Sequence, residues 1–146
     1  MTTVADILKA KGGQSIHGIE PTATVFDALQ LMAQKDIGAV LVMDKGRIAG
    51  IFSERDYARK LALAARSSKE TQLRDVMTTS VIYVRPDQTS ADCMALMTQN
   101  RLRHLPVMEG EQVIGLISIG DLVKNIISEQ QFIISQLEHY IAGDVR

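Results

Sequence analysis

The sequence contains an internal repeat with an offset of 65 residues. When residues 21–57 are placed on residues 86–122, 11 of 37 positions are identical without a gap. Further upstream, residues 4–8 resemble residues 73–77 at an offset of 69. A fixed offset between similar segments is the signature of a duplicated structural unit. We therefore expect a first repeat over residues 4–66, a second over residues 71–127, and a C-terminal helical extension over residues 128–146.

Both repeats predict the same order of elements. In the first, Thr24 is a candidate N-cap for a helix that ends near Lys35, because apolar residues follow it at helical spacing. Two short apolar strands, 39–43 and 48–52, flank a tight turn, and a second helix begins at Ser53. The second repeat predicts a helix over 89–100, strands over 104–108 and 112–117, and a helix from Ser118. Short strands precede the two prolines, over 16–20 and 81–84.

This order makes each repeat a β-α-β-β-α unit of mixed α/β (α+β) class. A unit of about 60 residues buries little apolar surface alone, so the two units are expected to pack against each other. Beyond the second repeat, apolar residues continue roughly at helical spacing toward residue 143. We expect this long C-terminal helix to serve an interface; its apolar positions are Leu122, Ile126, Ile127, Ile133, Leu137 and Ile141.

Composition narrows the classes of function. Sixteen basic against seventeen acidic residues leave a net charge of −1, and aromatic residues make up 4% with no Trp, so nucleic acid is a disfavoured partner. The longest stretch without a charged residue is nine residues, too short for a membrane helix, and no secretory signal is recognisable. A cytoplasmic location is the expectation.

Catalytic signatures are missing from the sequence. The single cysteine allows no internal disulfide, and the three histidines lack the spacing of a zinc site. Neither a nucleophile elbow nor a phosphate-binding P-loop is present. We therefore expect no enzyme activity, no catalytic residue, no metal and no catalytic cofactor. The methionines occupy apolar positions of helices and strands, where they are expected to fill the core.

The most informative motif is G-x-x-S-x-x-D, which occurs at residues 50–56 and again at residues 115–121. In each repeat it lies where a strand passes into a helix. One interpretation is structural: the serine caps the helix, and the acidic residue three positions later completes a capping box. The other is functional, because a helix N-terminus attracts phosphate and a carboxylate accepts hydrogen bonds from ribose hydroxyls.

The tandem units with this motif resemble a pair of cystathionine β-synthase (CBS) domains, a pseudo-twofold arrangement known as a Bateman module. The segments 50–57, 75–78 and 103–107 are similar to stand-alone CBS-pair proteins of bacteria and to their plant organelle relatives. The resemblance implies a non-catalytic sensor. It implies regulatory ligands that contain adenosine, such as AMP, ADP, ATP, NAD or S-adenosylmethionine, bound in clefts between the repeats.

The resemblance also assigns residues to two sites. It places the ribose of one ligand on Asp56 and that of another on Asp121. Phosphate contacts are expected from Ser53, Arg55, Arg103, His104 and Ser118. Each cleft borrows its far wall from the other repeat: Leu102, Arg103, His104 and the strand around Ile82 for the Asp56 site, and Ile37, Gly38, Ala39 and the segment near His17 for the Asp121 site, where Gly120 is also expected.

Several alternatives remain open. Arg103 and His104 fit a solvated strand edge as well, and His17 fits an ordinary surface histidine. If Arg55 and Arg103 both contact phosphate, we expect the Asp56 cleft to bind the ligand that carries more phosphate groups or binds more tightly. The resemblance further implies a homodimer formed through residues 24–35, residues 89–100 or the C-terminal tail, and an unidentified target protein. A ligand-free scaffold with the same fold is the alternative function.

Overall fold

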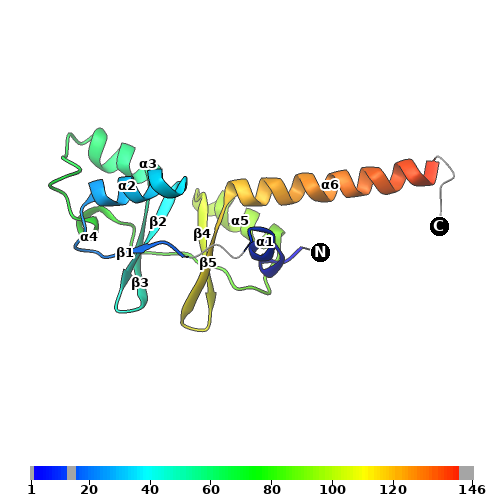
Figure 1. Cartoon of the computed structure of the whole chain (residues 1–146), viewed down its shortest axis with the longest axis horizontal. Helices are drawn as coiled ribbons and strands as arrows, with labels where there is room; N and C mark the ends of the chain where they lie inside the picture. Colours follow the sequence, from blue (N-terminus) through cyan, green and yellow to red (C-terminus); the bar gives the residue numbers. More distant parts are fainter. Residues whose placement is uncertain (1, 13–15, 142–146) are drawn as a thin grey trace.

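The computed structural model of the chain describes residues 2–12 and 16–141 (Figure 1). Two small sheets lie next to each other with helices around them, and one long helix projects from the body. The elements are, in order, α1 (Val4–Ala10), β1 (Gly18–Ile19), α2 (Val25–Lys35), β2 (Ala39–Asp44), β3 (Arg47–Ser53), α3 (Glu54–Tyr57), the π-helical turn η1 (Ala58–Ala62), α4 (Leu73–Val76), α5 (Ser90–Asn100), β4 (His104–Glu109), β5 (Gln112–Ser118) and α6 (Ile119–Ile141).

The expected mixed α/β repeat is confirmed. Helix α2 begins at a capping box between Thr24 and Asp27, and α5 begins at the equivalent box between Thr89 and Asp92. Each helix is followed by an antiparallel hairpin, β2–β3 in the first repeat and β4–β5 in the second. Both hairpins contain an irregularity at the same place, before Met43 and before the matching methionine of β4.

The short lead strands are smaller than expected. In the first repeat β1 covers two residues and pairs with β2 in parallel. In the second repeat the expected strand over 81–84 is a single parallel bridge from Val84 to Val107. Pairing stops there because the chain turns at once: the Arg85 N–H donates to the side chain of Gln88.

The helix expected after Ser53 also differs. Its first turn, α3, passes into the π-helical η1, where the N–H of Leu63 donates to the carbonyl of Ala58, five residues back. The helical segment that begins after Ser53 therefore ends at Ala62. Leu61 still reaches the core of the first repeat.

Each repeat receives its first helix from elsewhere in the chain. Val4 and Ile7 of α1 are buried in the core of the second repeat, with Val84 and Leu105 among others. Conversely, α4 is buried in the core of the first repeat. The backbone bonds are equivalent: Val4 N–H donates to the carbonyl of Gln88, as Leu73 N–H donates to that of Ala23. The repeat in sequence and the unit that packs in space are therefore offset.

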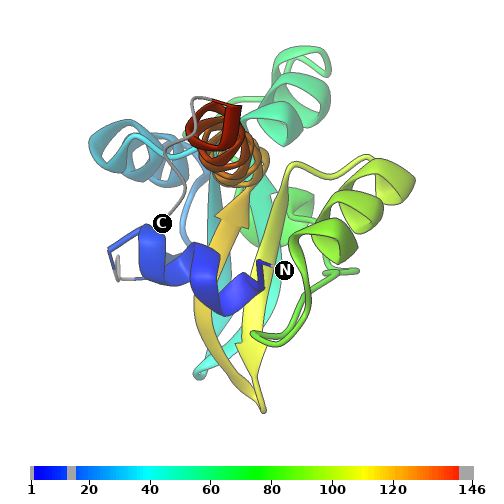
Figure 2. The same cartoon turned by 90° about the vertical axis from the view of Figure 1, so that its right-hand side faces the viewer.

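Helix α6 continues the second repeat as one helix of 23 residues. Only Leu122 of it is fully buried, and the C-terminal part of the helix projects from the two repeats (Figures 1 and 2). Within residues 2–12 and 16–141 no helix is long and apolar enough to cross a membrane.

Candidate functional site

Both copies of the repeated motif form capping boxes. The Ser53 backbone N–H donates to Asp56 Oδ2 at 2.9 Å, and the Asp56 N–H donates back to Ser53 Oγ at 3.2 Å. In the second repeat, Ser118 N–H donates to Asp121 Oδ2 at 2.8 Å, and Asp121 N–H donates to Ser118 Oγ at 3.2 Å. The structural interpretation of the motif is thus correct. The functional interpretation stays open, because each carboxylate also forms an ion pair with a lysine besides its contacts in the capping box.

Asp121 pairs with a residue from the other end of the chain. Lys11, which ends α1, places its Nζ 2.9 Å from Asp121 Oδ2 and donates to the carbonyl of Leu116 at 2.7 Å. Burial on its own raises the pKa of Asp121, but the Ser118 N–H and the Lys11 ammonium outweigh it, so the pKa lies below its ordinary value. Asp121 is therefore held as a carboxylate in a largely enclosed place.

A cavity of about 720 Å³ opens beside this ion pair. Its size falls in the range of small-molecule sites. Both repeats line it, together with α1. Its wall includes six residues that were assigned to the Asp121 site from the sequence: Ile37, Gly38, Ala39, Ser118, Gly120 and Asp121. It also includes Lys11, Lys124, Asn125 and Ser128. The sequence-based wall of the Asp121 site is thus gathered in one place.

A smaller pocket of about 90 Å³ adjoins the first and shares Lys11, Ile37 and Ala39 with it. Apolar side chains make up most of its wall, among them Leu8, Ile16, Leu41 and Ile114. His17 lies here, so the structure places it in a pocket wall. Together the two hollows offer a polar end at Asp121 and an apolar end next to His17.

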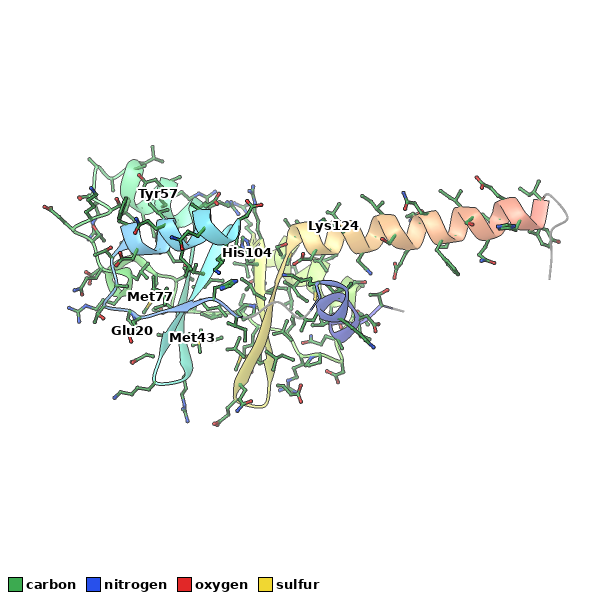
Figure 3. The ribbon with its side chains drawn as sticks, in the orientation of Figure 1. Glu20, Met43, Tyr57, Met77, His104 and Lys124 are labelled. Atoms are coloured by element: carbon green, nitrogen blue, oxygen red, sulfur yellow. The ribbon has the colours of Figure 1, made fainter. Side chains whose placement is uncertain are left out.

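His104 lies in the wall of the Asp121 cavity, at the junction of the two repeats (Figure 3). The sequence analysis assigned it to the Asp56 site. Its imidazole is so close to the first repeat that a Cβ on Gly38 would be 3.3 Å from Nε2. Burial lowers the pKa of His104, and the nearby carboxylate of Asp121 only partly opposes this. The imidazole is therefore held in its neutral form.

The Asp56 side carries a cluster of positive charge. The pKa of Arg55 is lowered, first by the positive charge of Arg103. Arg55 also donates to the carbonyl of Arg101 at 3.4 Å. Asp56 itself meets Lys60 Nζ at 3.5 Å. The other two expected wall residues pack against the core of the second repeat, and their role in a cleft stays a prediction: Ile82 and Leu102.

Sequence reasoning missed the lysines of the Asp121 cavity. It placed positive charge at the Asp56 site alone, whereas Lys11 and Lys124 bring two ammonium groups to the other site. Lys124 follows Asp121 by three residues on the same helix, and this spacing places the two side chains next to each other on one face of the helix. The sequence position of Lys11 does not indicate its contact with Asp121, because only the packing of α1 against the second repeat brings Lys11 to the cavity.

Two further observations concern ligands. Asn125 Oδ1, in the wall of the cavity, is buried and lacks a hydrogen-bond partner among the described residues. Buried polar atoms are nearly always paired, so an unpaired acceptor in a cavity wall suits a ligand donor. Within the described parts of the chain, no group of three His, Cys, Asp or Glu side chains is arranged to hold a metal ion.

Comparison with known proteins places these features in a family. The sequence model of the CBS domain matches residues 14–63 and 73–128. A mitochondrial CBS domain-containing protein of Arabidopsis thaliana, CBSX3, is 40% identical over 97% of this chain and 73% of its own length. A putative signal-transduction protein with CBS domains from Burkholderia ambifaria has a solved structure with a TM-score of 0.85. It is 56% identical, over 88% of this chain and 96% of the other.

A more distant structure shares the fold. The CBS domain pair of protein MJ0100, solved in complex with 5′-methylthioadenosine and S-adenosyl-L-methionine, superposes with a TM-score of 0.77. The match covers 88% of this chain and 98% of that one, at 20% identity. The pairing of two repeats is therefore found across widely divergent sequences.

Proposed function

Because the chain belongs to the CBS-domain family, whose domain pairs are regulatory in general, we propose that it senses a phosphorylated adenosine nucleotide bound in the Asp121 cavity. The observation that carries this proposal is the composition of the cavity wall. Two acidic residues, Asp36 and Asp121, line a hollow between the repeats together with two lysines and an unpaired amide oxygen. These groups match the ribose hydroxyls, the phosphate and a further donor of such a ligand.

Each group has a role in the proposed complex. The Asp121 carboxylate accepts from the ribose hydroxyls; its contacts with Ser118 and Lys11 are both on Oδ2. Lys11 and Lys124 contact the phosphate, with Ser118 at the start of the helix. The adenine lies in the adjoining apolar pocket, against Ile37, Ala39 and the segment that carries His17. Gly38 and Gly120 leave the cavity free of side chains at those positions.

The ammonium groups of Lys11 and Lys124 offer contacts to the phosphates of AMP, ADP, ATP or NAD, beside the carboxylates of Asp36 and Asp121. We propose a second, similar site at Asp56, with Ser53, Arg55 and Arg103 for phosphate. The bound nucleotide contacts both repeats, so it stabilises whichever relative arrangement of the repeats it fits best. That change is read by a separate target protein.

Thermal stability in the presence of nucleotides tests the proposal. At a concentration of about 100 times the dissociation constant, one ligand stabilises the folded protein by roughly 2.7 kcal/mol. We expect upward shifts of Tm with AMP, ADP, ATP or NAD. Asp121→Ala should abolish the shift if the Asp121 cavity is the main site, and Asp56→Ala reports on the second.

The chain contains a matched control for the loss of a helix cap. Asp27 forms the same capping box as Asp121 but at the start of α2, and it is exposed. Asp27→Ala should lower Tm without removing the nucleotide shift. If Asp27→Ala and Asp121→Ala reduce the shift equally, Asp121 acts only through helix capping. If no nucleotide shifts the wild-type protein, the ligand-free scaffold becomes the better account.

A further inference from the structure

The outer face of α6 carries an apolar stripe that the described chain does not cover. Along this stripe the large apolar side chains are each at least 46% exposed: Val123, Ile127, Ile134, Leu137 and Ile141. They follow one another at steps of four and three residues once Gln130 is included. This alternation is the a/d pattern of a coiled-coil seam.

The body of the protein lies on other sides of the helix. Leu122, about 100° around the helix from Val123, is the residue that enters the core of the second repeat. Glu129 accepts a hydrogen bond from the Thr2 hydroxyl, so it faces α1. Viewed end-on, α6 lies above α1, with α2 on one side and α5 on the other (Figure 2). The stripe is a different face from the one that holds Leu122 and Glu129, and its exposed side chains can receive a second helix.

We propose that α6 pairs with α6 of a second copy of this chain in an antiparallel coiled coil whose layers are centred at residue 132. In that register Val123 packs on the partner's Ile141, and Ile127 packs on the partner's Leu137. Gln130 meets the partner's Ile134. Every layer thus pairs an a position of one helix with a d position of the other. Each contact occurs twice, as a twofold-symmetric interface between identical chains requires.

Charge on one flank favours this direction. In an antiparallel pair the e positions, which follow the d positions Val123, Gln130 and Leu137, lie opposite the e positions of the partner helix. Charges at such flanking positions decide the orientation of coiled coils. Here the e positions hold Lys124, Gln131 and Glu138. Lys124 then faces the partner's Glu138, the same pair recurs at the other end, and the two Gln131 side chains meet at the twofold axis. The opposite flank is apolar, with Ile133 next to the partner's Ile133.

A parallel pair lacks this complementarity. Each helix would present Lys124 at the same level as the partner's Lys124, with apolar residues rather than acids across the seam. The proposal goes beyond nucleotide sensing and does not depend on it, because the seam is separate from the cavity apart from Lys124. Its tests are therefore carried out without nucleotide, and their failure leaves the thermal-shift result unaffected.

Cross-linking of the full chain distinguishes the directions. Gln131→Cys should be joined into covalent dimers by a short bis-maleimide, since both copies lie at the axis. Lys124→Cys should not, because the two sites are about 21 Å apart along the helices. The native Cys93 is buried, so the wild-type chain serves as the unreactive control. Cross-linking of both variants indicates a parallel pair, and cross-linking of neither indicates no pairing; either result overturns the proposal.

Charge reversal provides a second test, in analytical ultracentrifugation. Lys124→Glu and Glu138→Lys should each raise the dimer dissociation constant, roughly tenfold, and the double variant should restore it. Leu137→Glu should give a monomer. Phe132→Glu is the matched control, because Phe132 is 64% exposed on α6 but lies outside the stripe. Equal dissociation by Phe132→Glu and Leu137→Glu, or a double variant as weak as the single ones, overturns the register.

Discussion

At the scale of single residues, His104 makes stability depend on pH. Burial lowers the pKa of His104, and the positive charges of Lys11 and Arg103 add to this, while the carboxylate of Asp121 only partly opposes it. The unfolded chain has the ordinary value near 6.5. The unfolded state therefore binds a proton at a higher pH than the folded state does. This contribution to the free energy of unfolding is complete above about pH 6.5 and is lost as the pH falls toward the folded-state pKa.

Chemical denaturation at pH 7.5 and pH 5.5 measures this effect. We expect the wild-type protein to be less stable at pH 5.5, and His104→Gln to lose less stability over the same interval. Asp121 does not interfere, because its lowered pKa confines its own loss of stability to pH values below about 4. Equal losses in wild type and His104→Gln would show that another group titrates in this range.

The residues of the Asp121 cavity show which parts of a site can be predicted from local sequence patterns. Ser118, Gly120 and Asp121 share one motif, whereas Ile37 to Ala39 were assigned through the resemblance to CBS pairs, in which each cleft borrows its far wall from the other repeat. Lys11 was not found, since its distance from Asp121 in sequence carries no information about contact. Its position depends on α1 crossing to the other repeat, which is a property of tertiary packing.

At the scale of elements, the glycines of the two motif copies explain how α4 and α1 can pack closely against the strands of the first and second repeats. A Cβ on Gly50 would be 2.8 Å from the backbone carbonyl of Thr78, in the segment after α4. A Cβ on Gly115 would be 2.6 Å from a terminal methyl of Leu8, in α1. In both repeats the strand lacks a side chain where the crossing segment passes over it.

The two contacts differ in what has to move, which predicts unequal effects. Gly50→Ala must displace backbone that is paired with Ile51, and should destabilise the protein by about 1–3 kcal/mol. Gly115→Ala needs only a new rotamer of Leu8, and should cost less than about 1 kcal/mol. Thermal unfolding of both variants measures the difference. A larger loss for Gly115→Ala would mean that α1 is held more rigidly than α4.

Helix starts and hairpins were predictable because their causes are local. Thr24 and Thr89 cap their helices through an acid three residues later, and the apolar runs of β2 and β4 fill the cores. The π-helical turn η1 was not predictable, because its sequence has ordinary helical spacing. The single bridge at Val84 depends on a turn immediately after it, which the apolar pattern of 81–84 does not reveal.

At the scale of the whole molecule, the two packing units have different connectivity. The first is continuous in sequence, from β1 to the segment after α4, over residues 16–80. The second combines α1 with everything after Thr79, so its core is discontinuous. Because both units and α1 line the Asp121 cavity, the crossing of α1 also ties this cavity to the N-terminal end of the described chain.

This connectivity predicts which fragments fold. A fragment of residues 16–80 keeps Leu73 and Val76 in its core, whereas the sequence repeat 4–66 loses them and exposes the apolar side chains of α1. Each buried side chain of this size contributes about 1.5–3 kcal/mol, a large share of the stability of a domain of about 65 residues. We expect residues 16–80 to melt cooperatively in circular dichroism and residues 4–66 to be largely unfolded. Similar melting of both fragments would mean that α4 is dispensable for the first core, and the repeat in sequence would then be the folding unit.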